Sequence, residues 1–133
     1  MLILAYHRVN PGAKDGLSVS PEMLEAQLTH LRNRGWENVV LDELVASGDL
    51  MAQPGKFAIT FDDGYRDNYT HAFPILERLG LRAIVYVSTA FVETGECFPW
   101  VIRNANGREP HDDDRPLTWD HLRSHLSALP VED

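Results

Sequence analysis

Two adjacent carboxylates, Asp62 and Asp63, are the residues with the clearest chemical potential. They directly follow the apolar run at residues 57–61 and precede Gly64. Adjacent carboxylates repel each other, and a divalent cation relieves that repulsion. Because neighbouring side chains of a strand point to opposite faces, one acid can hold a metal while the other accepts a proton. The pair alone leaves another reading open, in which one acid caps a helix and the other is solvated.

Histidine is the other residue type that suits such chemistry. His7 ends the apolar run of residues 2–6, so we expect it on the same rim as the acids, where its imidazole could contact substrate or metal-bound water. A hydrogen bond to a neighbouring loop is the alternative role. His121 and His125 have the spacing that places both on one helix face. We interpret this second pair as exposed helical histidines.

Alternating strands and helices are predicted around these residues. The predicted strands are residues 2–6, buried on both faces, and residues 39–41, 57–61 and 83–87. Four helices are predicted. The first follows Ser20-Pro21 and ends at Gly35, and the second begins at Asp42. The third spans residues 69–79 with an irregular start at Pro74, and the fourth spans residues 119–129 after Thr118. This order predicts an α/β fold with a parallel sheet, whose carboxyl end carries the chemistry.

Residues 88–116 lack a clear period. Their glycines and prolines predict a long surface loop, with one turn of helix near residues 100–104. Asp112, Asp113 and Asp114 lie in this loop, and we expect them to form a solvated face.

Composition narrows the classes of partner. The chain has 133 residues, 44% of them hydrophobic, which is enough for one globular domain, and a formal net charge of -8. This acidity argues against a nucleic-acid backbone or an anionic membrane surface as the main partner. The single cysteine, Cys97, cannot form an internal disulfide. The first apolar run is too short for a signal peptide or a membrane span, so the chain as written is expected in the cytoplasm unless its true N-terminus lies upstream.

Three segments together carry a family resemblance. TFDDGYRDNY at residues 60–69, ILAYHRV at residues 3–9 and LRAIVYVST at residues 81–89 resemble the polysaccharide deacetylases, the NodB-homology or carbohydrate esterase family 4 group. The resemblance implies a distorted (β/α) barrel that removes N-acetyl groups from sugars by metal-assisted hydrolysis. It implies that Asp62 is the general base and Asp63 a ligand of a divalent metal, usually zinc, which lowers the pKa of bound water.

The sequence also departs from this family. The His-Ser/Thr-x-x-His motif that supplies two more metal ligands has no counterpart, because Leu122 stands where Ser or Thr is expected between His121 and His125. A catalytic zinc site normally has three protein ligands, and a (β/α) barrel needs roughly 200 residues or more. We therefore expect residues 1–133 to form the N-terminal part of a NodB-like domain, with about four strands and open sheet edges that favour self-association.

Three functions remain open at this point. The first is a metal-dependent N-deacetylase of an N-acetylated polysaccharide, with the missing ligands supplied from elsewhere. The second is an inactive family remnant that binds a glycan or a partner. The third is an acid-pair phosphotransfer domain, which the adjacent acids disfavour because such enzymes use Asp-x-Asp.

Overall fold

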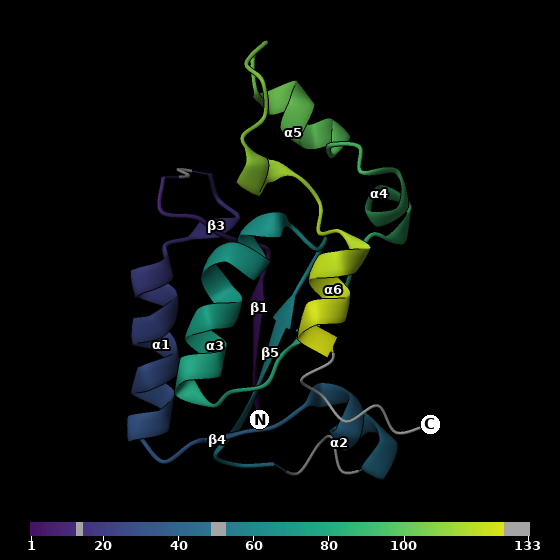
Figure 1. Ribbon diagram of the computed structural model, residues 1–133. Coiled ribbons are helices and arrows are strands. Elements are labelled where there is room, and N and C mark those ends of the chain that lie inside the picture. The colour runs from purple at the N-terminus through teal and green to yellow at the C-terminus, as the bar shows by residue number, and fades with distance from the viewer. Residues whose placement is uncertain (13–14, 49–52, 127–133) are drawn as a thin grey trace.

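The computed structural model describes residues 1–12, 15–48 and 53–126. Its strands are β1 (Leu2–Tyr6), β2 (Arg8–Val9), β3 (Ser18–Val19), β4 (Glu37–Asn38), β5 (Lys56–Phe61) and β6 (Ile84–Val85). Its helices are α1 (Pro21–Asn33), α2 (Leu41–Ser47), α3 (Phe73–Leu79), α4 (Thr89–Thr94), α5 (Pro99–Asn104) and α6 (Trp119–Leu126), with the π-helical turn η1 (Asn68–Ala72) and the 3-10 turn η2 (Asp112–Asp114) (Figure 1).

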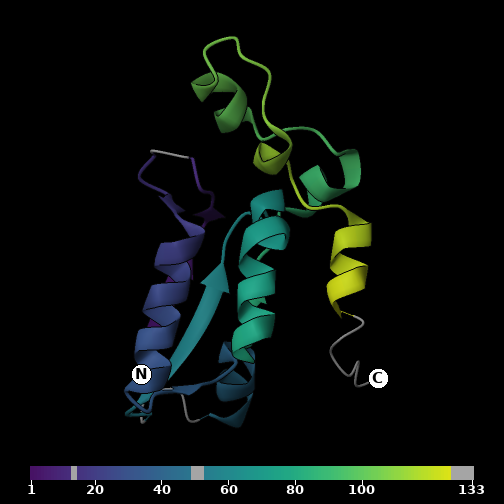
Figure 2. The ribbon, with the colours of Figure 1, turned by 60° about the vertical axis from the view of Figure 1, so that its left-hand side comes forward.

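The main sheet is built around β5. Strand β1 pairs with β5 along its whole length, while β4 and β6 pair with the first and last residues of β5 on its other side. All these pairings are parallel, which confirms the predicted α/β class. Helices α1 and α3 stand side by side against this sheet in both views (Figures 1 and 2). Because β5 lies between strands and under these helices, residues 57–61 are buried.

Strand β1 forms as predicted, but its predicted burial on both faces is wrong. Among the described strands it pairs only with β5, so its other edge is open. Leu2 and Ile3 are 36% and 46% exposed. An open groove of about 540 Å³ runs between β1 and α1, lined in part by Leu4, Tyr6 and Leu31. An apolar sequence therefore identifies the strand here without identifying what covers it.

Local capping chemistry explains where α1 begins. The Ser20 hydroxyl accepts a hydrogen bond from the Met23 amide at 3.1 Å, and Pro21 occupies the first turn, as the sequence predicts. Leu24 and Leu28 bury the inner face of this helix against the core. At 13 residues α1 is the longest described helix, and none of the described helices is both long and apolar enough to cross a bilayer.

The next strand and helix lie elsewhere than predicted. The strand expected at residues 39–41 is displaced to β4, because Glu37 and Asn38 pair with the start of β5. Leu41 instead begins α2, whose N-cap is Val40, so Asp42 lies in the first turn and is not the cap. The β-branched sequence at residues 39–40 thus serves as the connection between the two elements.

The helix that ends at Leu79 has the irregular start that the sequence predicts. The chain first makes the wide turn η1 and only then the regular helix α3, with Pro74 in its first turn. Proline has no amide hydrogen, so a wider turn before it avoids a missing helical bond. Gly80 ends α3 in the left-handed conformation, as expected.

Residues 88–117, which we call the rim arm, contain more structure than predicted. The arm includes α5 where one helical turn is expected, together with the unpredicted α4 and η2. Its first and last residues hydrogen-bond adjacent positions: the Ser88 amide donates to Asp63 O at 3.2 Å, and the Leu117 amide donates to Gly64 O at 2.8 Å. The arm therefore leaves from and returns to the turn that carries the two acids.

Two predictions at the end of the described chain have different outcomes. Strand β6 forms but is shorter than predicted and only half-buried. Helix α6 begins after Thr118, whose hydroxyl accepts from the His121 amide at 3.2 Å, as predicted for a cap. The predicted extension of this helix to residue 129 lies outside the described residues.

Candidate active site

The two acids lie at the carboxyl end of β5. The Asp62 amide donates to Tyr6 O at 2.8 Å, and the Tyr86 amide donates to Phe61 O at 2.8 Å, so strands on both sides hold the chain at this point. Asp63 then takes a φ of +70° and Gly64 a φ of +76°. Two successive left-handed residues turn the chain sharply, and for an aspartate this conformation is uncommon. Strain of this kind is often found at functional positions.

His7 and Asp62 lie together, as the strand order predicts. Nε2 of His7 is 3.8 Å from Oδ2 of Asp62, a separation longer than a hydrogen bond. The two side chains remain 33% and 40% exposed, so both are accessible from solvent. The pair therefore offers a carboxylate and an imidazole to a ligand at the rim of the sheet; the individual roles of the two residues stay predictions.

Asp63 presents a carboxylate without a protein partner in the described part of the chain. Its main-chain oxygen is engaged by the rim arm, while its side chain has neither a hydrogen bond nor an ion pair with any described residue. Within residues 1–12, 15–48 and 53–126, no three residues of the histidine, cysteine, aspartate or glutamate type come together as metal ligands. The described residues therefore do not by themselves fit a zinc site.

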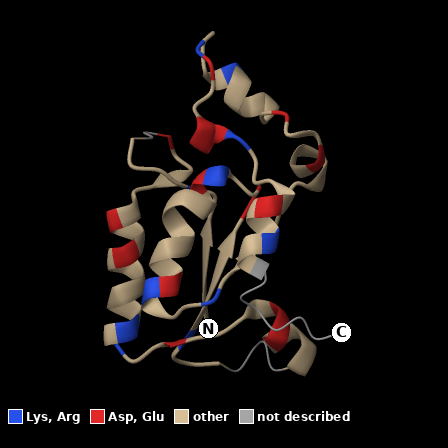
Figure 3. Ribbon diagram, viewed as in Figure 1, with Lys and Arg blue, Asp and Glu red and all other residues tan. Residues whose placement is uncertain are grey.

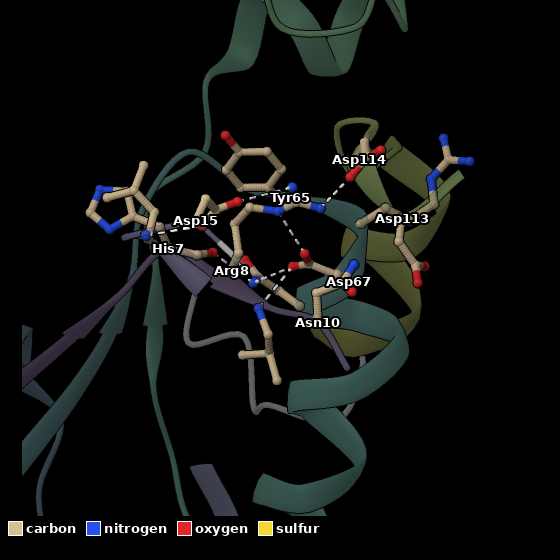
Figure 4. A network of polar contacts seen from close by, with 12 residues as sticks. His7, Arg8, Asn10, Asp15, Tyr65, Asp67, Asp113 and Asp114 are labelled. Carbon is tan, nitrogen blue, oxygen red and sulfur yellow. Dashed lines mark hydrogen bonds and ion pairs between the residues drawn. The ribbon is translucent and has the colours of Figure 1, made fainter. Parts of the chain in front are cut away.

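A buried network of charged side chains lies next to His7 (Figure 4). The guanidinium of Arg8, only 7% exposed, donates from Nε to Asp67 Oδ2 at 2.9 Å and from Nη2 to Asp114. It also lies 4.8 Å from the ring centroid of Tyr65 and 3.9 Å from Asp15. Burial raises the pKa of Asp67 to about 6 against the opposing effect of Arg8. At neutral pH the network therefore contains an ionised, paired carboxylate.

The acidic run of η2, coloured red in Figure 3, is only in part the predicted solvated face, because the side chain of Asp112 is 69% exposed but those of Asp113 and Asp114 are 16% and 21% exposed. Asp112 pairs with Arg66, Asp113 with His71 and Asp114 with Arg8. The partner side chains come from β2, η1 and the turn before η1, which are distant from η2 in sequence. These pairs fix the returning end of the rim arm against β2, against η1 and against the turn that follows the acids. Sequence reasoning missed them because a partner in space leaves no mark on a local pattern.

The histidines of α6 are not freely exposed. The ring of His121 lies 4.5 Å from that of Tyr69, and the ring of His125 stacks on Phe73 at 4.0 Å. Burial lowers the pKa of both imidazoles. Both rings therefore pack α6 against η1 and α3, which corrects the expectation of exposed helical histidines.

Tyr65 and Cys97 are held in packed surroundings. Tyr65 is 1% exposed and accepts a hydrogen bond from the Trp100 indole at 2.6 Å, so it is part of the packed core. Cys97 is a free thiol whose pKa is raised by burial, which opposes its activation.

Comparison with known proteins identifies the family of this chain. The sequence pattern of the family described as "Polysaccharide deacetylase" matches residues 51–124, more than half of the chain. The chain belongs to the polysaccharide deacetylase family. The Bacillus subtilis (strain 168) protein YxkH is 33% identical over 87 residues, which are 64% of this chain and 30% of that protein. The Escherichia coli (strain K12) poly-beta-1,6-N-acetyl-D-glucosamine N-deacetylase is 28% identical over 133 residues, 97% of this chain and 19% of that enzyme.

Solved structures share the fold. A de-N-acetylase from Aggregatibacter actinomycetemcomitans superposes with a TM-score of 0.73 at 23% identity, over 98% of this chain and 52% of that one. IcaB from Ammonifex degensii gives a TM-score of 0.70 at 24% identity, over 96% and 48%. These superpositions confirm the predicted fold, part of a NodB-type β/α barrel. The chain spans about half the length of these structures and less than a third of the curated relatives.

Proposed function

We propose that this chain carries the acid pair of a hydrolase that removes N-acetyl groups from an N-acetylated polysaccharide. The observation that carries the proposal is the placement of Asp62 and Asp63 on one turn at the sheet rim, with His7 at 3.8 Å from Asp62. Membership of the polysaccharide deacetylase family supports the reaction class. The E. coli relative supports a β-1,6-linked N-acetylglucosamine polymer as the first substrate to examine.

In this proposal Asp62 is the general base. Its carboxylate is 40% exposed and accepts no close hydrogen bond from a described residue, so it is free to take a proton from an attacking water. His7, on the adjacent strand exit, would bind the substrate beside that water. Because 3.8 Å separates Nε2 from Oδ2, the two groups can contact a ligand atom between them without first breaking a hydrogen bond with each other.

We further propose that Asp63 is one ligand of a divalent cation, with zinc as the preferred metal. Its carboxylate has no partner within the described residues, which is the state expected of an anion reserved for a cation. A third protein ligand is absent from those residues, so the remaining ligands of this metal would have to lie elsewhere. We expect the 133-residue chain to bind zinc weakly, because one or two carboxylates hold this ion poorly.

Two measurements test the proposal. Acetate release from a β-1,6-linked N-acetylglucosamine pentamer is measured for the natural gene product, and we expect Asp62→Asn to lower the rate about 100-fold or more. Equal rates would contradict the role of Asp62. Zinc titration of the 133-residue chain by calorimetry should give weak binding that Asp63→Asn removes. Binding that survives Asp63→Asn but is lost in the double variant His121→Ala and His125→Ala would place the metal on α6 instead.

The second candidate function is glycan binding without catalysis, by an inactive member of the family that lacks the other metal ligands. It predicts that the pentamer binds without acetate release in the natural gene product, with and without added zinc. No contact among the described residues favours it over hydrolysis.

A further inference from the structure

We propose that Asp67 and Asn68 are positioning residues that hold His7 opposite Asp62, an inference that deepens the function proposed above for that pair. Both residues begin the wide turn that follows the acids, and both side chains are completely buried. Neither side chain is available to substrate, so any effect on the chemistry must act through the residues that they contact.

Their contacts are with three successive residues that start at His7. The Asn68 side-chain amide donates to His7 O at 3.0 Å. Asp67 accepts from Arg8 Nε at 2.9 Å and from the Val9 amide at 3.3 Å (Figure 4). Two adjacent side chains thus hold the main chain at His7 and Val9 and the side chain of Arg8 between them.

The orientation of the Asn68 amide is determined by these contacts. Its nitrogen also donates to Asp67 Oδ1 at 3.1 Å, so both nearby groups are acceptors. Turning the amide over would bring its oxygen against the His7 carbonyl and the Asp67 carboxylate, which would repel it. Its oxygen has no hydrogen-bond partner within the described residues, a cost accepted in a fully buried position. That cost is consistent with a side chain whose role is to donate from its nitrogen to His7 O and Asp67 Oδ1.

The acids and the groups that hold His7 belong to one short segment, residues 62–68. On the other side of His7, Tyr6 O accepts from the Asp62 amide at 2.8 Å. His7 is therefore fixed before and after by the same segment that carries Asp62. A displacement of this segment moves Asp62 and the main chain at His7 together, which keeps their separation constant.

The test measures whether His7 still senses Asp62. In the isotopically labelled 133-residue chain, Asp62→Asn should shift the ring carbon resonances of His7 at constant pH, because a charge close to the ring is removed. In the Asn68→Ala background this response should fall by about half or more, since electrostatic coupling weakens with distance. A purely structural role would lower the melting temperature without changing the response.

Matched variants keep the test decisive. Asn68→Ala is the primary variant because it retains the Arg8–Asp67 ion pair, whereas Asp67→Asn leaves Arg8 buried beside a neutral group. Asp112→Asn is the control, since it breaks only the pair between Arg66 and the exposed Asp112 and should leave the response intact. If Asn68→Ala does not fold, Asn68→Ser is judged by the same measure.

Two results would overturn the inference: a full response in the folded Asn68 variant, or no response to Asp62→Asn in the native background. The measurement uses no substrate. Failure of acetate release therefore refutes the proposed hydrolysis, and the positioning of His7 is decided separately.

Discussion

Gly64 is the residue of the acid turn whose replacement has the most definite consequence. A Cβ at this position would lie 3.0 Å from Val87 Cγ1 and 3.3 Å from Val87 Cα, and the residue has a φ of +76°. The left-handed conformation costs a non-glycine residue about 1 to 2 kcal/mol. Overpacking against a neighbour adds about 1 to 3 kcal/mol. Gly64→Ala should therefore lower the free energy of unfolding by about 2 to 5 kcal/mol, measured by urea denaturation.

Gly95→Ala separates the two contributions. Gly95 ends α4 with a φ of +70°, and a Cβ there would meet none of the described atoms within 4 Å. It should lose only the conformational part, about 1 to 2 kcal/mol. In a Val87→Ala background the excess loss of Gly64→Ala should also shrink. Val87→Ala removes only the contact with Cγ1 and keeps Cα and Cβ at 3.3 Å. Equal losses for the two glycine variants, or an excess that is undiminished in Val87→Ala, would refute the reasoning from the close contact.

Three other predictions follow from burial and exposure. The pKa of Asp67 rises from 3.8 to about 6 on folding, so the native state binds the proton more tightly than the unfolded state. The free energy of unfolding should therefore fall by up to about 3 kcal/mol as pH rises through this window. Urea denaturation at each pH should show this slope, and the slope should be absent in Asp67→Asn. The pKa values of His121 and His125 are lowered on folding, so the stability that these neutral rings contribute should be lost as pH falls below 6.5. In the double variant His121→Gln and His125→Gln, helix content measured by circular dichroism should decline less steeply with falling pH. The open edge of β1 should promote self-association that Ile3→Lys reduces in sedimentation experiments, and a concentration-independent monomer would contradict it.

The elements that carry the acids could be predicted because their signals are local. Residues 57–61 are apolar and end in charge, and Ser20-Pro21 has the chemistry of a helix start. A parallel sheet then places the ends of β1 and β5 together, which is why His7 could be expected beside Asp62 before any coordinates were known.

The features that sequence reasoning missed depend on contacts distant along the chain. β4 forms at Glu37 and Asn38, residues with little strand preference, because they lie against β5. Arg8 is buried because Asp67 and Asp114 meet it, and these partners follow it by 59 and 106 positions. Composition alone indicated a solvated acidic run, whereas tertiary pairing engages every one of its carboxylates.

The attachment of the rim arm has a consequence for how such proteins diversify. Its ends meet neighbouring positions, Asp63 and Gly64, so the distance that the segment must close stays short whatever its length. The entropy of closing a loop grows only slowly with added residues. Natural variation can therefore lengthen, trim or exchange this segment, remodelling the surface next to the carboxylates while their backbone frame stays the same.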